Sequence, residues 1–135
     1  MLIKKNFVSN PSLQVEIRDW LKLSLPTLSG EPLFVFSLVI NEVVQNVLRY
    51  VYHGEQGKNI VITISQDSQA IYTAAIQDFG APCQPHLFLD VARQPTEKGG
   101  MGIALVKKNT LSFSISENRQ GNLAQLRFDA ASVKH

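Results

Sequence analysis

The stretch from Val35 to His53, followed by Gly54, constrains the fold of this chain more than any other. At about 100° per residue its apolar side chains fall on one stripe, which predicts an amphipathic helix with a wide buried face. These apolar residues are Phe36, Ile40, Val43, Val47 and Val51. A different stripe of the same helix carries Glu42, Asn46 and Arg49 within roughly 60° of one another. We therefore expect an acid, an amide and a base at the rim of the buried face.

Composition and charge limit the possible functions. The chain has 135 residues and a hydrophobic content of 44%, which suits a single domain over residues 1–135 with one core. Its net charge of +2 comes from scattered lysines and arginines, so direct binding of nucleic acid is not expected. The single cysteine, Cys83, excludes an intrachain disulfide and a cysteine metal cluster, as in proteins of reducing compartments.

No segment has the pattern of a membrane anchor. The longest apolar run, Leu33 to Ile40, is followed by Asn41 and Glu42 and falls far short of the roughly twenty residues that a membrane span needs. Residues Met1 to Val8 contain two lysines but no apolar core of a signal peptide. We therefore expect a soluble, cytoplasmic protein with no membrane association.

Turn residues and periodicity predict the elements before the central helix. Leu2 to Val8 can form a short strand, and Asn10-Pro11-Ser12 can begin a helix with proline in its first turn. The apolar stripe of that helix consists of Leu13, Ile17, Trp20 and Leu21. Leu25-Pro26 should end it, and residues 29–32 should form a turn that leads into the central helix.

The second half of the chain alternates in the manner of strands. Residues 60–65 and 70–77 predict two strands joined by a hairpin turn. A helix over 101–109 should precede a further strand pair, 111–115 and 124–128. Between these parts, Cys83 to Lys98 has no period and contains two prolines, which is typical of a lid or a disordered insertion. The expected fold is α+β: a two-layer sandwich with a mixed, mostly antiparallel sheet and about three helices on one face.

Three short motifs could carry chemistry. They are Glu42-x-x-x-Asn46 on the central helix, Asp78-x-Gly80 at a strand end, and Gly100-Met101-Gly102 at a helix start. A glycine-rich helix start can hold a phosphate, because backbone N–H groups and the helix dipole converge there. Each motif alone also has a purely structural explanation: a solvated helix face, a turn aspartate, or a turn that needs glycine. Together, in this order, they are much more specific.

The combination resembles the Bergerat-fold (GHKL) ATPases, which include gyrase, histidine kinases and MutL. Within them it is most similar to the small anti-sigma factor serine/threonine kinases of bacterial partner-switching systems. The resemblance covers about residues 2 to 130 and rests on three motifs of that family. The matching residues are Glu42, Asn46, Arg49 and Tyr52, then Asp78, Gly80 and Pro82, and finally Gly100 and Gly102 with Gly99 beside them.

The resemblance implies how ATP and Mg²⁺ would be bound. Asp78 would accept a hydrogen bond from the adenine amino group, and Gly80 would let the backbone approach the base. Asn46 would give its side-chain carbonyl to Mg²⁺, whose remaining ligands would be phosphates and water. Glu42 would orient and deprotonate the attacking hydroxyl group.

Further roles implied by the resemblance concern the phosphates. Gly100, Met101 and Gly102 would present backbone amides to them. Lys98 would pair with the γ-phosphate as the lid closes. Arg49 has two equal interpretations, a phosphate contact or a partner in a surface ion pair.

Two departures from the family pattern affect the expected site. Relatives commonly carry a threonine in the last strand near the adenine-binding aspartate, where this chain places Leu123 or Ala124. Adenine recognition would then lack one polar partner. The second motif is followed by Cys83-Gln84-Pro85, which should alter the geometry of the lid without abolishing binding.

Two classes of function follow. In the first, the protein is a kinase that phosphorylates a serine or threonine of an anti-sigma factor antagonist, binds a sigma factor, and forms a homodimer. In the second, it is a nucleotide-binding interaction module that sequesters a sigma factor or another regulator without turnover. Glu42 favours the kinase, because a binding module has no need of a carboxylate there. Histidine autophosphorylation and gyrase-like or MutL-like activity are not expected, since no added helical or transducer domain is seen, and an α+β domain without a ligand is the remaining alternative.

Overall fold

The computed structural model describes residues 1–82 and 102–133. In chain order the elements are β1 (Leu2–Val8), α1 (Leu13–Ser24), α2 (Gly30–Asn46), the π-helix η1 (Val47–Val51), β2 (Asn59–Gln66), β3 (Ile71–Asp78), α4 (Gly102–Lys108), β4 (Ser112–Glu117), β5 (Asn122–Asp129) and the 3-10 helix η2 (Ala130–Ser132).

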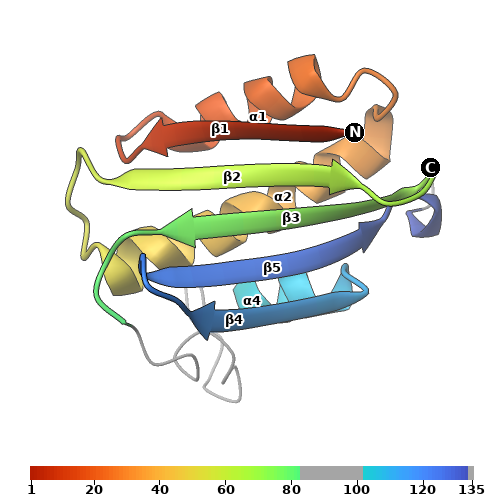
Figure 1. The fold of residues 1–135 in the computed structure, drawn as a ribbon. Coiled ribbons are helices and arrows are strands. Elements are labelled where there is room, and N and C mark those ends of the chain that lie inside the picture. Colours follow the sequence, from red (N-terminus) through yellow and green to blue (C-terminus); the bar gives the residue numbers. More distant parts are fainter. Residues whose placement is uncertain (83–101, 134–135) are drawn as a thin grey trace.

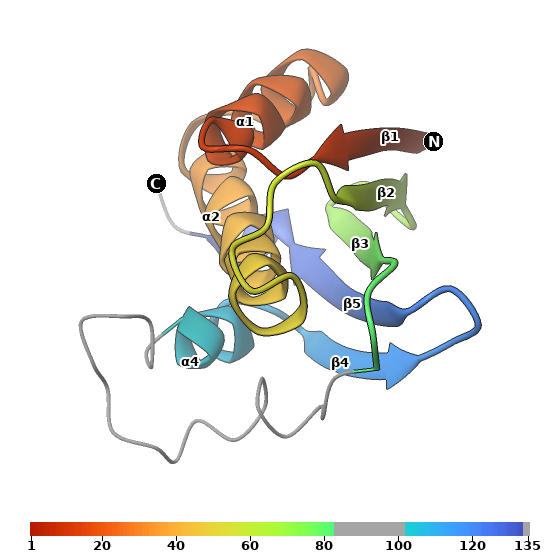
Figure 2. The same ribbon diagram turned by 90° about the vertical axis from the view of Figure 1, so that its left-hand side faces the viewer.

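The strands form one sheet in the order β1-β2-β3-β5-β4, and every neighbouring pair is antiparallel. Helices α1, α2 and α4 cover one face of this sheet, as Figures 1 and 2 show from two directions. The predicted α+β two-layer sandwich is confirmed.

The core lies between α2 and the sheet, and the apolar stripe of the central helix is the predicted one. In α1 the predicted stripe is buried at Leu13, Ile17 and Leu21, while Trp20 is half-buried. The stripe of the central helix is buried from Phe36 to Val51. The inward residues of the inner strands are also buried: Ile60, Ile62, Ile64, Tyr72, Ala74, Ile76, Ala124, Leu126 and Phe128. Phe36 stacks on Phe128 with 4.9 Å between ring centroids and lies 5.6 Å from the ring of Tyr72. These contacts fix how α2 lies across β3 and β5.

The central helix begins earlier than predicted. Residues 29–32 were expected to form a turn before a helix at Val35, but α2 begins at Gly30. Pro32 therefore lies in the first helical turn, where proline is tolerated because the N–H groups there have no acceptor within the helix. Gly30 has a φ of 64°, so the chain enters the helix through a conformation that glycine adopts readily.

The same helix changes type directly after Asn46. Residues Val47–Val51 are a π-helix, in which Tyr52 donates its backbone N–H to the carbonyl of Val47 at 3.0 Å. Such wider turns are rare and occur frequently at functional sites. A constant rotation of 100° per residue therefore does not describe the helix beyond Asn46.

The helical segment Gly30–Val51 is long and apolar enough to cross a membrane by length and composition alone. Of its most hydrophobic window, 56% is buried inside the domain. Core helices of soluble domains pass the same test, so this single segment is weak evidence for a membrane span.

Candidate functional site

The end of β3, the last turns of α2 and η1, and the start of α4 lie on the same side of the domain (Figure 1). Two glycines show how closely these segments approach one another. A Cβ at Gly80, just after β3, would overlap the side chain of Val51 in η1. A Cβ at Gly102, the first residue of α4, would overlap the carboxylate of Glu42 in α2. The fold thus brings the described residues of the three predicted motifs to one side of the domain.

Asp78 is the last residue of β3 and is 1% exposed. Its Oδ1 accepts hydrogen bonds from the backbone N–H of Gly80 at 3.1 Å and from the backbone N–H and Nδ2 of Asn122, both at 3.0 Å. Its Oδ2 is buried and has no hydrogen-bond partner among the described residues. Burial raises the pKa of Asp78, and the three N–H donors lower it in part. A buried acceptor without a donor is unfavourable, so Oδ2 is suited to receive one from a ligand.

Asn122 was not predicted as a site residue. The sequence placed Leu123 or Ala124 where relatives carry a threonine near the adenine-binding aspartate, and it predicted that adenine recognition would lack one polar partner. In the structure the polar neighbour of Asp78 on this strand is Asn122, the first residue of β5, which makes two hydrogen bonds to Asp78. The missing contact to adenine stays a prediction. The missing signal was the strand register, in which Leu123 pairs with Gln77, so that Asn122 lies opposite Asp78.

The turn between β4 and β5 is fitted closely against the end of β3. The side chains of Gln77 and Asn118 bond each other in both directions, at 2.7 and 3.2 Å. A Cβ at Gly121 would lie 2.5 Å from the backbone oxygen of Asp78 and 2.8 Å from its Oδ1. Only glycine therefore allows this close approach, and the turn holds the position of Asp78.

Tyr52 links the π-helix to the segment after Asp78. Its hydroxyl accepts from the backbone N–H of Phe79 at 2.8 Å and donates to the carbonyl of Asn59 at 2.5 Å. Burial raises the pKa of Tyr52, and the nearby charge of Asp78 raises it further. The hydroxyl therefore stays neutral. The overlap of a Cβ at Gly80 with Val51 gives Gly80 a packing role, and its predicted approach to a base remains a prediction.

Glu42 and Asn46 lie one turn apart on α2. Glu42 is half-buried with its carboxylate against Gly102. Asn46 is 3% exposed, and its Nδ2 is buried without a hydrogen-bond partner in the part of the chain that the structure describes. A buried amide in this state can be satisfied by a ligand.

A family model described as the histidine kinase-like ATPase domain matches residues 7–128, which include all of these side chains. The chain belongs to the histidine kinase-like ATPase domain family. Membership implies ATP binding as part of a regulatory or kinase-like function. A comparison with curated protein sequences found no significant match.

A solved structure with a similar fold is that of the mycobacterial sensor histidine kinase MprB. The TM-score is 0.57 at 13% sequence identity, and the match covers 94% of this chain and 97% of the other. At this identity the likeness shows the fold alone. It agrees with the GHKL fold expected from the sequence.

The donor set of this ATPase domain suits Mg²⁺ only if a nucleotide supplies further ligands. In residues 1–82 and 102–133, no group of three or more His, Cys, Asp and Glu side chains could hold a metal ion. The side-chain amide of Asn46 offers one neutral oxygen, one helical turn after Glu42 on α2. Mg²⁺ commonly takes one or two protein oxygens and fills its other positions with phosphates and water. The residues present therefore fit an ion that arrives with ATP.

Of the other predicted site residues, Arg49 lies in the π-helix at the surface, and the rest lie outside the described residues. Arg49 is exposed, with its guanidinium 5.7 Å from the ring centre of Tyr50. Arg49 lies within the π-helix. The rotation of 100° per residue that predicted a common stripe with Glu42 and Asn46 therefore does not hold for it. Lys98, Gly100 and Met101 lie outside the described residues, as does the expected lid from Cys83 to Lys98.

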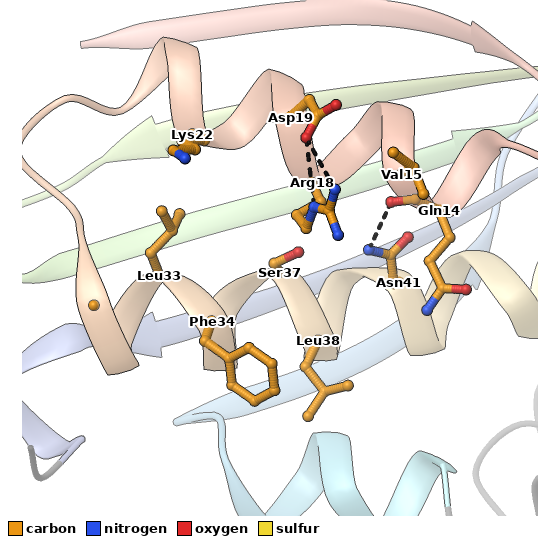
Figure 3. Close-up of a pocket in the computed structure, with 11 residues that line it drawn as sticks. Gln14, Val15, Arg18, Asp19, Lys22, Leu33, Phe34, Ser37, Leu38 and Asn41 are labelled. Atoms are coloured by element: carbon orange, nitrogen blue, oxygen red, sulfur yellow. Dashed lines mark hydrogen bonds and ion pairs between the residues drawn. The ribbon is translucent and has the colours of Figure 1, made fainter.

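A separate groove of about 570 Å³ lies between α1 and α2 (Figure 3). Its floor includes Asn41, whose Nδ2 donates to the carbonyl of Gln14 at 3.4 Å. The charged pair Arg18 and Asp19, 3.3 Å apart, lies on its α1 side. None of the described motif residues lines the groove, so it is distinct from the candidate nucleotide site of the ATPase domain.

Proposed function

We propose that this protein is an ATP-dependent serine/threonine protein kinase and an anti-sigma regulatory factor of a partner-switching system. Its substrate would be an anti-sigma factor antagonist, and its regulatory partner a sigma factor. The observation that carries the proposal is Glu42, a half-buried carboxylate one turn before Asn46 and against the start of α4. Nucleotide binding alone gives no reason for a carboxylate at this place.

Glu42 would act as the general base. Its carboxylate would take the proton of the substrate hydroxyl as that oxygen attacks the γ-phosphorus of ATP. The bond between the γ-phosphorus and the bridging oxygen then breaks, and ADP leaves. Contact with Gly102 limits the positions that the carboxylate can take, and such positioning is what efficient proton transfer requires.

The nucleotide would be held from both ends. Asp78 would accept the adenine amino group through Oδ2, the buried oxygen without a donor among the described residues. Asn46 would hold Mg²⁺, which neutralises charge on the phosphates when it is bound. Gly102, together with Gly100 and Met101, would donate backbone amides to the phosphates, and Lys98 would contact the γ-phosphate.

The partners and location belong to the same proposal. The resemblance to anti-sigma factor kinases supports a homodimer in the cytoplasm. It also supports protein partners with no direct contact to nucleic acid. Sedimentation of the purified protein tests the dimer.

Phosphotransfer tests the proposal. Proteins captured from the source cells with the purified chain are incubated with γ-labelled Mg-ATP and with either wild type or Glu42→Gln. We expect label on a serine or threonine of a captured partner, and a decrease on the order of 10²–10⁴ with Glu42→Gln. The affinity for Mg-ATP should stay unchanged in that variant.

Two results would count against the kinase. Equal transfer by the two proteins would remove Glu42 from catalysis. Absence of transfer by wild type, with Mg-ATP binding intact, would favour a nucleotide-binding interaction module that sequesters a sigma factor or another regulator.

A further inference from the structure

We propose that Asn122 determines base specificity, by holding Asp78 as an ionised acceptor with Oδ2 free for an amino group of the base. This inference rests on the proposed nucleotide site and assigns a positioning role to a residue that the three motifs do not include.

Asn122 makes three hydrogen bonds that hold Asp78 and the segment after it, and we call this set of bonds the Asn122 clamp. Its backbone N–H and its Nδ2 both donate to Oδ1 of Asp78 at 3.0 Å. The same Nδ2 also donates to the carbonyl of Ala81 at 3.0 Å. Asn122 is 3% exposed, so water competes little for these bonds. The side chain of Asn122 therefore joins the start of β5 both to Asp78 and to the segment that follows it.

This clamp leaves the two carboxylate oxygens in different states. Oδ1 receives three N–H donors, whereas Oδ2 is buried with no donor in residues 1–82 and 102–133. A carboxylate held in this way offers one acceptor in one direction. It matches a base that presents N–H at that point.

The ionisation of Asp78 decides which base fits. An ionised Oδ2 can only accept, while a protonated Oδ2 carries an O–H that donates. Burial raises the pKa of Asp78, and the N–H groups of Asn122 and Gly80 lower it. Loss of the Nδ2 donor would therefore favour the protonated form. The O–H of the protonated form would face another donor, the amino group at C6 of adenine, which is unfavourable. It could instead donate to the carbonyl at C6 of hypoxanthine.

Among residues 1–82 and 102–133, the other groups around Asp78 leave control of its ionisation to Asn122. Tyr52 faces it from the end of η1, and burial keeps its hydroxyl neutral by raising its pKa. Ile60, its register partner on β2, and Gly121 of the β4–β5 turn carry no charge. Glu117 and Arg119, the charged residues next to that turn, are exposed.

Threonine and valine at position 122 form a matched pair, because they have the same shape and only threonine can donate a hydrogen bond. Asn118→Ala serves as a control that loosens the same turn through its bonds to Gln77 without removing a donor from Asp78. Calorimetry with Mg-ATP and with Mg-ITP, which differ at C6 of the base, is carried out from pH 5.5 to 8.5. Carbon NMR of the ligand-free protein follows the ionisation of the Asp78 carboxyl group.

We expect wild type, Asn122→Thr and Asn118→Ala to prefer ATP across this range. In Asn122→Val the midpoint of Asp78 should move to higher pH, and each unit of that shift corresponds to about a tenfold change in the balance of the two forms. Its preference for ATP over ITP should fall at low pH and recover at high pH.

The outcomes distinguish this inference from the proposed function. An unchanged midpoint and unchanged preference in Asn122→Val would overturn the role of Asn122, and so would an equal loss of affinity for both nucleotides at every pH. Failure of wild type to bind ATP would instead contradict the nucleotide site itself.

Discussion

Gly102, the first residue of α4, lies directly against the carboxylate of Glu42, so that a Cβ there would overlap Oε2 and lie 3.4 Å from Cδ. The glycine at this position thus serves two segments at once. It lets α4 begin close to α2, and it leaves room for the carboxylate that we propose as the base.

Gly102→Ala should therefore impair catalysis more than folding. The added methyl group would displace the Glu42 carboxylate, and a displacement of about 1 Å can reduce a rate about 10²-fold. Kinetics of phosphotransfer and thermal unfolding would be measured together. Adding Gly102→Ala to Glu42→Gln should cause little further loss of rate, since both act on the same group; fully additive losses would contradict this link.

Asn46→Ala should weaken Mg-ATP binding, because it removes the side-chain oxygen assigned to the ion. Asn41→Ala provides a matched control. Asn41 is another buried asparagine of α2, its Oδ1 has no hydrogen-bond partner in the described part of the chain, and it lines the separate groove. Calorimetry should show a loss of affinity for the first variant alone. Similar losses in both would mean that α2 had been disturbed and that Asn46 has no specific role.

Gly80→Ala should destabilise the domain by about 1–3 kcal/mol, which is typical of overpacking. The new Cβ would overlap Val51 in the π-helix. Val51→Ala in the same chain should restore part of the loss by making room. Urea denaturation of the two single variants and the double variant measures the free energies of unfolding. If the loss in the double variant equals the sum of the two single losses, the side chains at positions 80 and 51 do not contact each other.

Asp78→Asn should stabilise the ligand-free protein at neutral pH while abolishing ATP binding. Because burial raises the pKa of Asp78 above 3.8 in the folded state, the folded protein holds the proton more tightly than the unfolded chain. Stability from this group is complete below 3.8 and is lost as the pH rises through the raised pKa. The neutral amide has no such dependence.

Unfolding free energies of the two proteins should therefore diverge as the pH rises from about 3 to 7, with the variant becoming the more stable. A difference between wild type and variant that is constant over this range would show that Asp78 has the same pKa in both states.

Sequence periodicity was sufficient for most of the fold. The inner strands β2, β3 and β5 and the central helix α2 each have a buried apolar face, so the spacing of residues such as Phe36, Ile62 and Leu126 indicates where they lie. The start of α2 was missed because Gly30 and Pro32 are common turn residues, and the sequence does not show that Pro32 lies in a first helical turn. The π-helix was missed because Val47 and Val51 stay buried in either geometry.

The candidate site was predicted in part. Glu42, Asn46, Asp78 and Gly102 lie in the segments that the fold brings to one side of the domain. Asn122 could not be found from motif spacing, because its bonds to Asp78 depend on the β3–β5 register. The places of Lys98, Gly100 and Met101 stay predictions, since they lie outside the described residues.

Thermal unfolding with Mg-ATP tests the central claim most directly, namely that this family member binds ATP through Asp78. At about a hundred times the dissociation constant, a ligand of the folded state adds about 2.7 kcal/mol to the free energy of unfolding. We predict an increase of this size for wild type and none for Asp78→Asn. The absence of any increase in wild type, or an equal increase in both proteins, would contradict the account.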